Sequence, residues 1–147
     1  MYGSSDKMVG VMNLYTSTGI LRYSQEEGYY RLVVNIDKEL ARYYFSLIPK
    51  WYDINRPKWL PHVTVVRPIK ETPIIFDAWG RYEGEKVEFQ YDGTVYSGKV
   101  YFWLNVFCKR LEVIRAELGL EVSSPYTRPP EGYKKCFHST IANMKDL

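Results

Sequence analysis

Two segments of the chain alternate between apolar positions and positions with a polar side chain. They are the segments 61–66 (Pro-His-Val-Thr-Val-Val) and 137–142 (Phe-His-Ser-Thr-Ile-Ala). Side chains two residues apart in a β-strand lie on the same face. The pattern therefore predicts two strands that each present an imidazole beside a hydroxyl: His62 with Thr64, and His138 with Thr140.

Helical spacing follows two further predicted strands. A strand over 29–36 leads through Asp37, a suitable N-cap, into a helix that ends near Ile48, before a proline. A buried strand over 100–107 leads into a helix with apolar residues at 111, 114 and 118, which ends at Gly119. Segment 30–40 can be aligned with segment 101–111. The order strand, helix, loop, His-x-Thr strand thus occurs twice.

The remaining segments complete a predicted α+β fold. A strand over 19–23 forms a hairpin with 29–36, and strands over 86–91 and 94–97 flank a turn at Asp92-Gly93. A helical turn is expected over 76–79, and a long irregular loop over 123–135, where loops of this length often form binding walls.

Length and composition bound the class of protein. The 147 residues suit a single domain, and a net charge of +3 suits a small anionic ligand better than a long nucleic-acid duplex. With 14 Tyr and 4 Trp, the chain has more large aromatic side chains than a small core requires, and some of them are therefore available to stack on nucleobases. Cys108 and Cys136 match no zinc or redox motif, so we expect no metal and no cofactor. The polar start and the lack of a long apolar run predict a cytoplasmic protein without a membrane partner.

The two His-x-Thr strands are the candidate catalytic groups. Either histidine alone is as well explained by a structural role, but the shared pattern of the only two in the chain favours a function. Near neutral pH one imidazole can remove a proton while the other donates one, and the two threonine hydroxyls can bind phosphate oxygens. The pair therefore indicates metal-free acid–base chemistry on a phosphodiester.

In this tandem arrangement the chain resembles the two-histidine phosphoesterases, the LigT-like superfamily. The sequences Pro-His-Val-Thr-Val-Val-Arg (61–67), Trp-Gly-Arg-Tyr-Glu-Gly (79–84) and Ile-Arg-Ala-Glu-Leu-Gly (114–119) are most similar to the phage anti-CBASS nucleases within it. The resemblance implies one bilobal domain over residues 1–147, with two pseudo-symmetric lobes and two antiparallel sheets flanking a central cleft. It also implies catalysis by His62 and His138, and phosphate binding by Thr64 and Thr140.

The implied activity is hydrolysis of 3′,5′-linked cyclic di- or trinucleotide immune signals, by a monomer in the cytoplasm of an infected bacterium. Two alternatives remain: an RNA-end 2′,3′-cyclic phosphodiesterase, and a non-catalytic sponge for cyclic nucleotides. Tyr23, Trp79 and Tyr126 are candidates for base stacking, with ordinary packing as the alternative for each. Arg67, Lys134 and Lys135 flank the motifs and are suited to attract an anion, or serve only as solvated surface charges.

Overall fold

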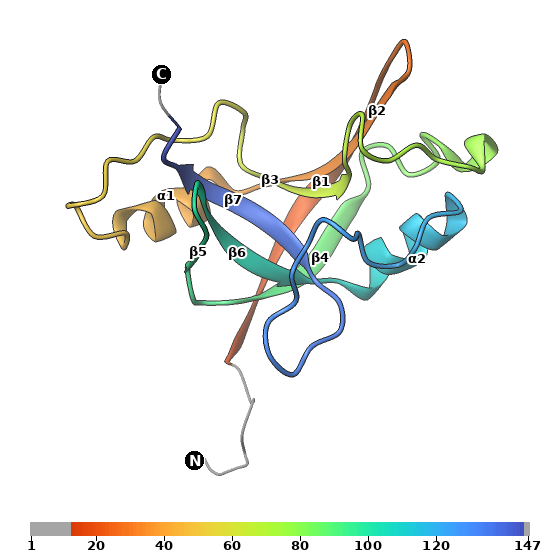
Figure 1. Ribbon diagram of the computed structural model, residues 1–147. Helices are drawn as coiled ribbons and strands as arrows, with labels where there is room; N and C mark the ends of the chain where they lie inside the picture. The colour runs from red at the N-terminus through yellow and green to blue at the C-terminus, as the bar shows by residue number, and fades with distance from the viewer. Residues whose placement is uncertain (1–12, 146–147) are drawn as a thin grey trace.

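The computed structural model describes residues 13–145, and within them an α+β fold (Figure 1). In chain order the elements are β1 (Leu14–Glu26), β2 (Tyr29–Ile36), α1 (Lys38–Ser46), β3 (His62–Val66), the 3-10 turn η1 (Phe76–Ala78), β4 (Lys86–Asp92), β5 (Tyr96–Ser97), β6 (Tyr101–Phe107), α2 (Lys109–Glu117) and β7 (Phe137–Asn143). Within this range neither helix has the length and apolar character needed to cross a bilayer. The polar start of the chain lies outside the described residues.

All seven strands belong to one antiparallel sheet, so the expectation of two flanking sheets is wrong. The order is β3-β2-β1-β4-β6, and both β7 and the short β5 also pair with β6. The reason is the length of β1, which begins at Leu14 rather than at Gly19. Its first part pairs with β4, from Leu14 opposite Asp92 to Ile20 opposite Lys86, while its second part pairs with β2. This ladder joins what would otherwise be two separate sheets.

The sheet curls so that its two outermost strands, β3 and β7, lie side by side. No backbone ladder joins these two strands in the described part of the chain. The helices lie at opposite ends of the molecule in Figure 1. Leu111 and Ile114 of α2 pack in a core with residues of β1, β2 and β3, whereas Tyr44 of α1 packs with residues of β6 and β7. Each helix therefore supports one of the histidine strands from behind.

The predicted start of α1 and the predicted end of α2 are confirmed by their capping groups, whereas α1 ends at Ser46, two residues before the expected Ile48. Asp37 Oδ1 accepts a hydrogen bond from the backbone N–H of Glu39 at 2.9 Å, as an N-cap does. Gly119, just after α2, has a φ of 80°, the left-handed conformation that suits glycine.

The two strands that flank Asp92-Gly93 do not pair with each other, because β5 pairs with β6 rather than with β4. The Asp92 carboxylate is buried and accepts hydrogen bonds from the Thr94 N–H at 2.9 Å and the Tyr96 hydroxyl at 3.3 Å. These bonds fold the chain into a local Asx-type turn, which directs it away from β4.

Candidate active site

The two histidine strands have the alternation expected of them. On β3, His62 and Thr64 are half-buried, whereas Val63 and Val65 are buried in the core. On β7, His138 and Thr140 are half-buried, whereas the residues between and beside them are buried. Because β3 and β7 lie side by side, both imidazoles and both hydroxyls are carried by neighbouring strands.

The ring of His62 is oriented by the loop that precedes its strand. Its Nδ1 lies 2.6 Å from the carbonyl oxygen of Leu60. A carbonyl oxygen can only accept, so Nδ1 carries the hydrogen, and Nε2 is the nitrogen left to exchange a proton with a ligand. Burial lowers the pKa of His62 below its ordinary value of 6.5, and the charges of Arg31 and Arg67 lower it further against the raising effect of Leu60.

His138 is held by an aromatic stack. Its ring lies 5.2 Å from that of Trp103 at 29°, and Trp103 lies 6.3 Å from Tyr96 at 24°. Trp103 is fixed in turn, because its Nε1 donates to Asn105 Oδ1 at 3.3 Å. Burial lowers the pKa of His138 to about 4, with a contribution from the charge of Arg67 and an opposing one from the backbone of Arg128. Its Nε2 is buried and has no hydrogen-bond partner among the described residues.

Arg67 connects the two histidines electrostatically. Its positive charge contributes to the lowered pKa of both His62 and His138, after burial as the main cause. The side chain is half-buried, and its Cζ lies 6.0 Å from the centre of the Tyr126 ring, which is 47% exposed. A phosphate bound between the histidines would therefore meet a cation, with an accessible aromatic ring beside it.

A buried ion pair anchors the segment that carries Arg67. The Arg115 guanidinium of α2 donates to both carboxylate oxygens of Glu71 at 3.1 and 2.8 Å, and to the carbonyl oxygen of Val65 on β3 at 2.7 Å. Glu71 Oε1 also accepts the backbone N–H of Arg67 at 3.0 Å. Between these two residues, Ile69 has a φ of 70°, a strained conformation for a β-branched side chain. The network fixes β3 and the segment that follows it to α2.

Tyr23 and Trp79 do not lie with the histidines. Their rings contact each other edge to face at 5.0 Å and pack against the core beneath α2. Tyr23 is paired with Leu32, and Leu32 with Val66, so all three share the core face of the sheet. Of the three aromatic residues expected to stack on bases, only Tyr126 lies beside a group of the candidate site. The sequence did indicate a core position for Tyr23, because it lies two residues after the apolar Leu21 and therefore on the same face of the strand.

Two further residues belong to the site and were not expected there. Arg31 lies on the same face of β2 as Asn35, which is paired with His62, and its charge acts on that histidine. Because Arg31 and Asn35 are four residues apart on one strand, they lie on the same face. The sequence alone does not place that face beside His62, because the pairing of β2 with β3 must be known first. Trp103 is paired with Thr140 across β6 and β7.

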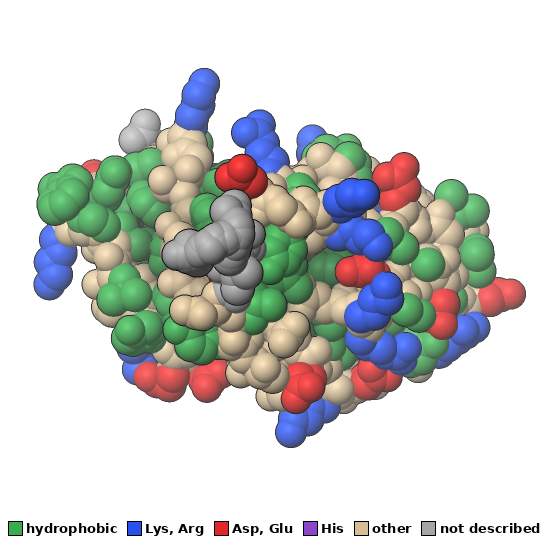
Figure 2. All heavy atoms as spheres, turned by 90° about the horizontal axis from the view of Figure 1, so that it is seen from below, with side chains coloured by type: hydrophobic (Ala, Val, Ile, Leu, Met, Phe, Trp, Pro, Cys, Tyr) green, Lys and Arg blue, Asp and Glu red, His purple; other side chains and the backbone are tan. Residues whose placement is uncertain are grey.

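Other surfaces carry mixed charge. The face in Figure 2 has Lys and Arg side chains next to Asp and Glu side chains.

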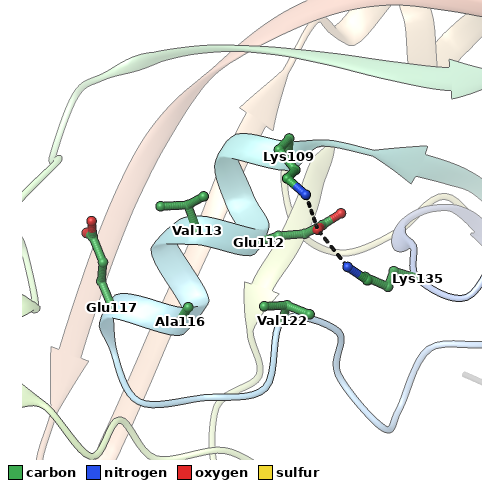
Figure 3. A pocket seen from close by; sticks show the side chains of 7 residues that line it. All are labelled: Lys109, Glu112, Val113, Ala116, Glu117, Val122 and Lys135. Carbon is green, nitrogen blue, oxygen red and sulfur yellow. Dashed lines mark hydrogen bonds and ion pairs between the residues drawn. The ribbon is translucent and has the colours of Figure 1, made fainter.

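Figure 3 shows a shallow hollow on the outside of α2, lined by Val113 and Val122 among others, where Glu112 Oε1 lies 3.3 Å from Lys135 Nζ. Lys135 is therefore engaged on the outer surface of α2, and Lys134 is exposed.

Among residues 13–145, no group of three or more His, Cys, Asp or Glu side chains is arranged to hold a metal ion. Comparisons with protein-family models, with curated proteins and with solved structures found no match to this chain.

Proposed function

We propose that this protein is a metal-independent phosphodiesterase that cleaves 3′,5′-linked cyclic di- or trinucleotides with a pair of histidines. The observation that carries the proposal is that His62 and His138, each two residues from a threonine on the same strand face, lie on the neighbouring strands β3 and β7, and that the charge of Arg67 acts on both. A phosphate that binds Arg67 would come within reach of two proton-transfer groups and two hydroxyl donors.

The reaction needs a neutral and a protonated imidazole. The neutral one takes the proton of a ribose 2′-hydroxyl as that oxygen forms a bond to the adjacent phosphorus. The bond from phosphorus to the 5′-oxygen breaks, and the imidazolium gives its proton to that oxygen. The products are a 2′,3′-cyclic phosphate and a free 5′-hydroxyl, after which water can open the cyclic phosphate. Thr64 and Thr140 donate hydrogen bonds to the non-bridging oxygens as negative charge builds up on them.

The substrate itself supplies part of the protonation pattern. In the free protein both histidines have a pKa below 6.5, so both are largely neutral at pH 7. A bound phosphodiester brings a negative charge that offsets Arg31 and Arg67 and favours the imidazolium form. Once the phosphodiester is bound, either ring can therefore serve as the acid and the other as the base.

We also infer that the domain consists of two related lobes within the single sheet. The order strand, strand, helix, strand occurs as β1-β2-α1-β3 and again, apart from the short β5, as β4-β6-α2-β7. Each helix has nine residues and begins two positions after the preceding strand ends. Each histidine is paired with an asparagine, His62 with Asn35 and His138 with Asn105. The equivalent strand partner of the two histidines supports a shared role.

The test is hydrolysis of cyclic di- and trinucleotides in EDTA by the unaltered protein and by the variants His62→Ala and His138→Ala. Each substitution should lower kcat by about 10²- to 10⁴-fold, the usual contribution of one proton-transfer group, with an unchanged circular dichroism spectrum. A substrate with 2′-deoxyribose at the cleaved position serves as the chemical control and should resist cleavage. Near-normal turnover by both variants would refute the mechanism.

The same assay separates the alternatives. Cleavage of 2′,3′-cyclic nucleotides without cleavage of cyclic dinucleotides would indicate an RNA-end phosphodiesterase. Recovery of intact cyclic nucleotide from the heat-denatured complex would indicate a sponge, and it would contradict the catalytic proposal.

A further inference from the structure

A second feature adjoins the histidine strands: a groove between α1 and the segment 56–61. After α1 the chain runs along the free edge of β7, where Asn55 and Asn143 exchange backbone hydrogen bonds at 2.8 and 3.0 Å. It then turns back to enter β3 at His62. The space enclosed by α1, this segment and β7 has a volume of about 280 Å³, near the lower limit for pockets that bind small ligands.

The groove is lined by cations and aromatic rings. Its charged lining residues are all basic: Lys38, Arg42, Arg56 and Lys58. Arg56 lies over the ring of Phe45, with its Cζ 4.3 Å from the ring centre. Arg42 is also paired with Glu39 on the exposed side of α1, at 2.7 Å. The protein as a whole has a net charge of only +3, so four cations around one groove are a local concentration of positive charge.

The groove is continuous with the catalytic strands. Thr140, the phosphate-binding candidate of β7, is one of its lining residues, and so is Pro61, which precedes His62. Trp59 lines it as well, with 64% of the residue exposed, and the guanidinium of Arg31 lies 5.3 Å from the centre of that ring. Arg31 is one of the two cations whose charge acts on His62. An anion bound in the groove would therefore be next to the reacting phosphate.

We propose that this groove binds the second nucleotide of the substrate, with its phosphate against the cations and its base on Trp59. The inference rests on the proposed function and deepens it, because it names the part of the protein that holds the nucleotide next to the one cleaved. The chemistry fits, because arginine and lysine bind phosphate oxygens, and an exposed tryptophan offers a flat surface to any base. A mononucleoside 2′,3′-cyclic phosphate would contact the histidine strands alone and leave the groove empty.

The experiment compares two substrates, 3′,5′-cyclic diadenylate and adenosine 2′,3′-cyclic phosphate, with the variants Trp59→Ala and Lys58→Met. Matched controls are Trp51→Ala and Lys50→Met, which change an exposed tryptophan and an exposed lysine outside the groove. Trp59→Ala should lower kcat/KM for the cyclic diadenylate by about tenfold to a hundredfold, as loss of one stacked base does. Its kcat/KM for the mononucleotide should change less than twofold, and the controls should match the unaltered protein on both substrates.

Equal losses on both substrates, or no loss on the cyclic diadenylate, would overturn the groove as a nucleotide site while leaving the proposed function intact. If the unaltered protein hydrolyses neither substrate, the proposed function fails. The Kd of cyclic diadenylate, measured by titration calorimetry, then tests whether the groove binds a nucleotide. A Kd weakened at least tenfold by Trp59→Ala, but not by Trp51→Ala, would support it. Absent binding, or a Kd that Trp59→Ala leaves unchanged, would overturn it.

Discussion

Replacement of the buried Arg115 by methionine should destabilise the protein more than replacement of an exposed arginine or lysine. Arg115 is 1% exposed, and its guanidinium holds three separate parts of the chain. It donates to the Glu71 carboxylate, to the Val65 carbonyl and, at 2.6 Å, to the Glu121 carbonyl. Methionine fills a similar volume but donates nothing, so these acceptors would lose their partner.

The expected cost follows from burial. Removal of one partner of a buried ion pair leaves an uncompensated charge and costs about 3–5 kcal/mol. The Glu71 side chain is only 6% exposed and would be left with the backbone N–H of Arg67. The chain offers a matched pair at the surface: Arg110 donates two hydrogen bonds to Glu85, both at 2.9 Å, but these side chains are 37% and 33% exposed. Arg110→Met should cost less than about 1 kcal/mol, because water screens such pairs.

Urea denaturation followed by circular dichroism measures both costs as changes in the free energy of unfolding. The double variant Arg115→Met/Glu71→Met should be less destabilised than the sum of the two single variants, by about 0.5–3 kcal/mol, because it no longer buries an unpaired charge. The reasoning would be refuted if Arg115→Met cost no more than Arg110→Met, or if the costs of the two buried substitutions simply added.

Three further predictions concern the histidines and α1. The pH profile of kcat/KM should have its maximum between about 4, the lowered pKa of His138, and 6.5, the ordinary value that the pKa of both histidines lies below: in more acidic solution no imidazole is left to act as the base, and in more alkaline solution none is left to act as the acid. A maximum above pH 7 would contradict the lowered values. Trp103→Leu should raise the pKa of His138 from about 4 towards 6.5 in an NMR titration, because it exposes the ring to water, whereas Trp51→Leu should leave it unchanged. Asp37→Ala should lower the free energy of unfolding by about 1 kcal/mol through loss of the N-cap bond, and a cost near zero in urea denaturation would show that α1 does not depend on it.

Local features could be predicted because they depend on residues close together in the sequence. The alternation at 62–66 and 137–143 follows from the period of a strand, and the ends of the helices follow from Asp37 and Gly119. In the same way, the two histidines were singled out by a repeated tripeptide pattern.

Pairing between distant strands could not be predicted in this way. Nothing in the alternation of β1 specifies that Leu14 lies opposite Asp92, 78 positions further along the chain, and that ladder decides between one sheet and two. The groove residues were missed for a related reason. Arg56, Lys58 and Trp59 read as an ordinary polar loop until the bridge between Asn55 and Asn143 lays them along β7.

The absence of a ladder between β3 and β7 within the described residues makes the separation of the two imidazoles a property of the whole sheet. The hydrogen-bonded connection from one histidine strand to the other passes through β2, β1, β4 and β6, so small changes in twist along that path add up in the distance between β3 and β7. Gly19 lies at its midpoint, paired with both Ile36 and Val87, and a Cβ there would lie 2.4 Å from the Asn35 carbonyl oxygen. A residue without a side chain thereby helps to set the distance between the two imidazoles.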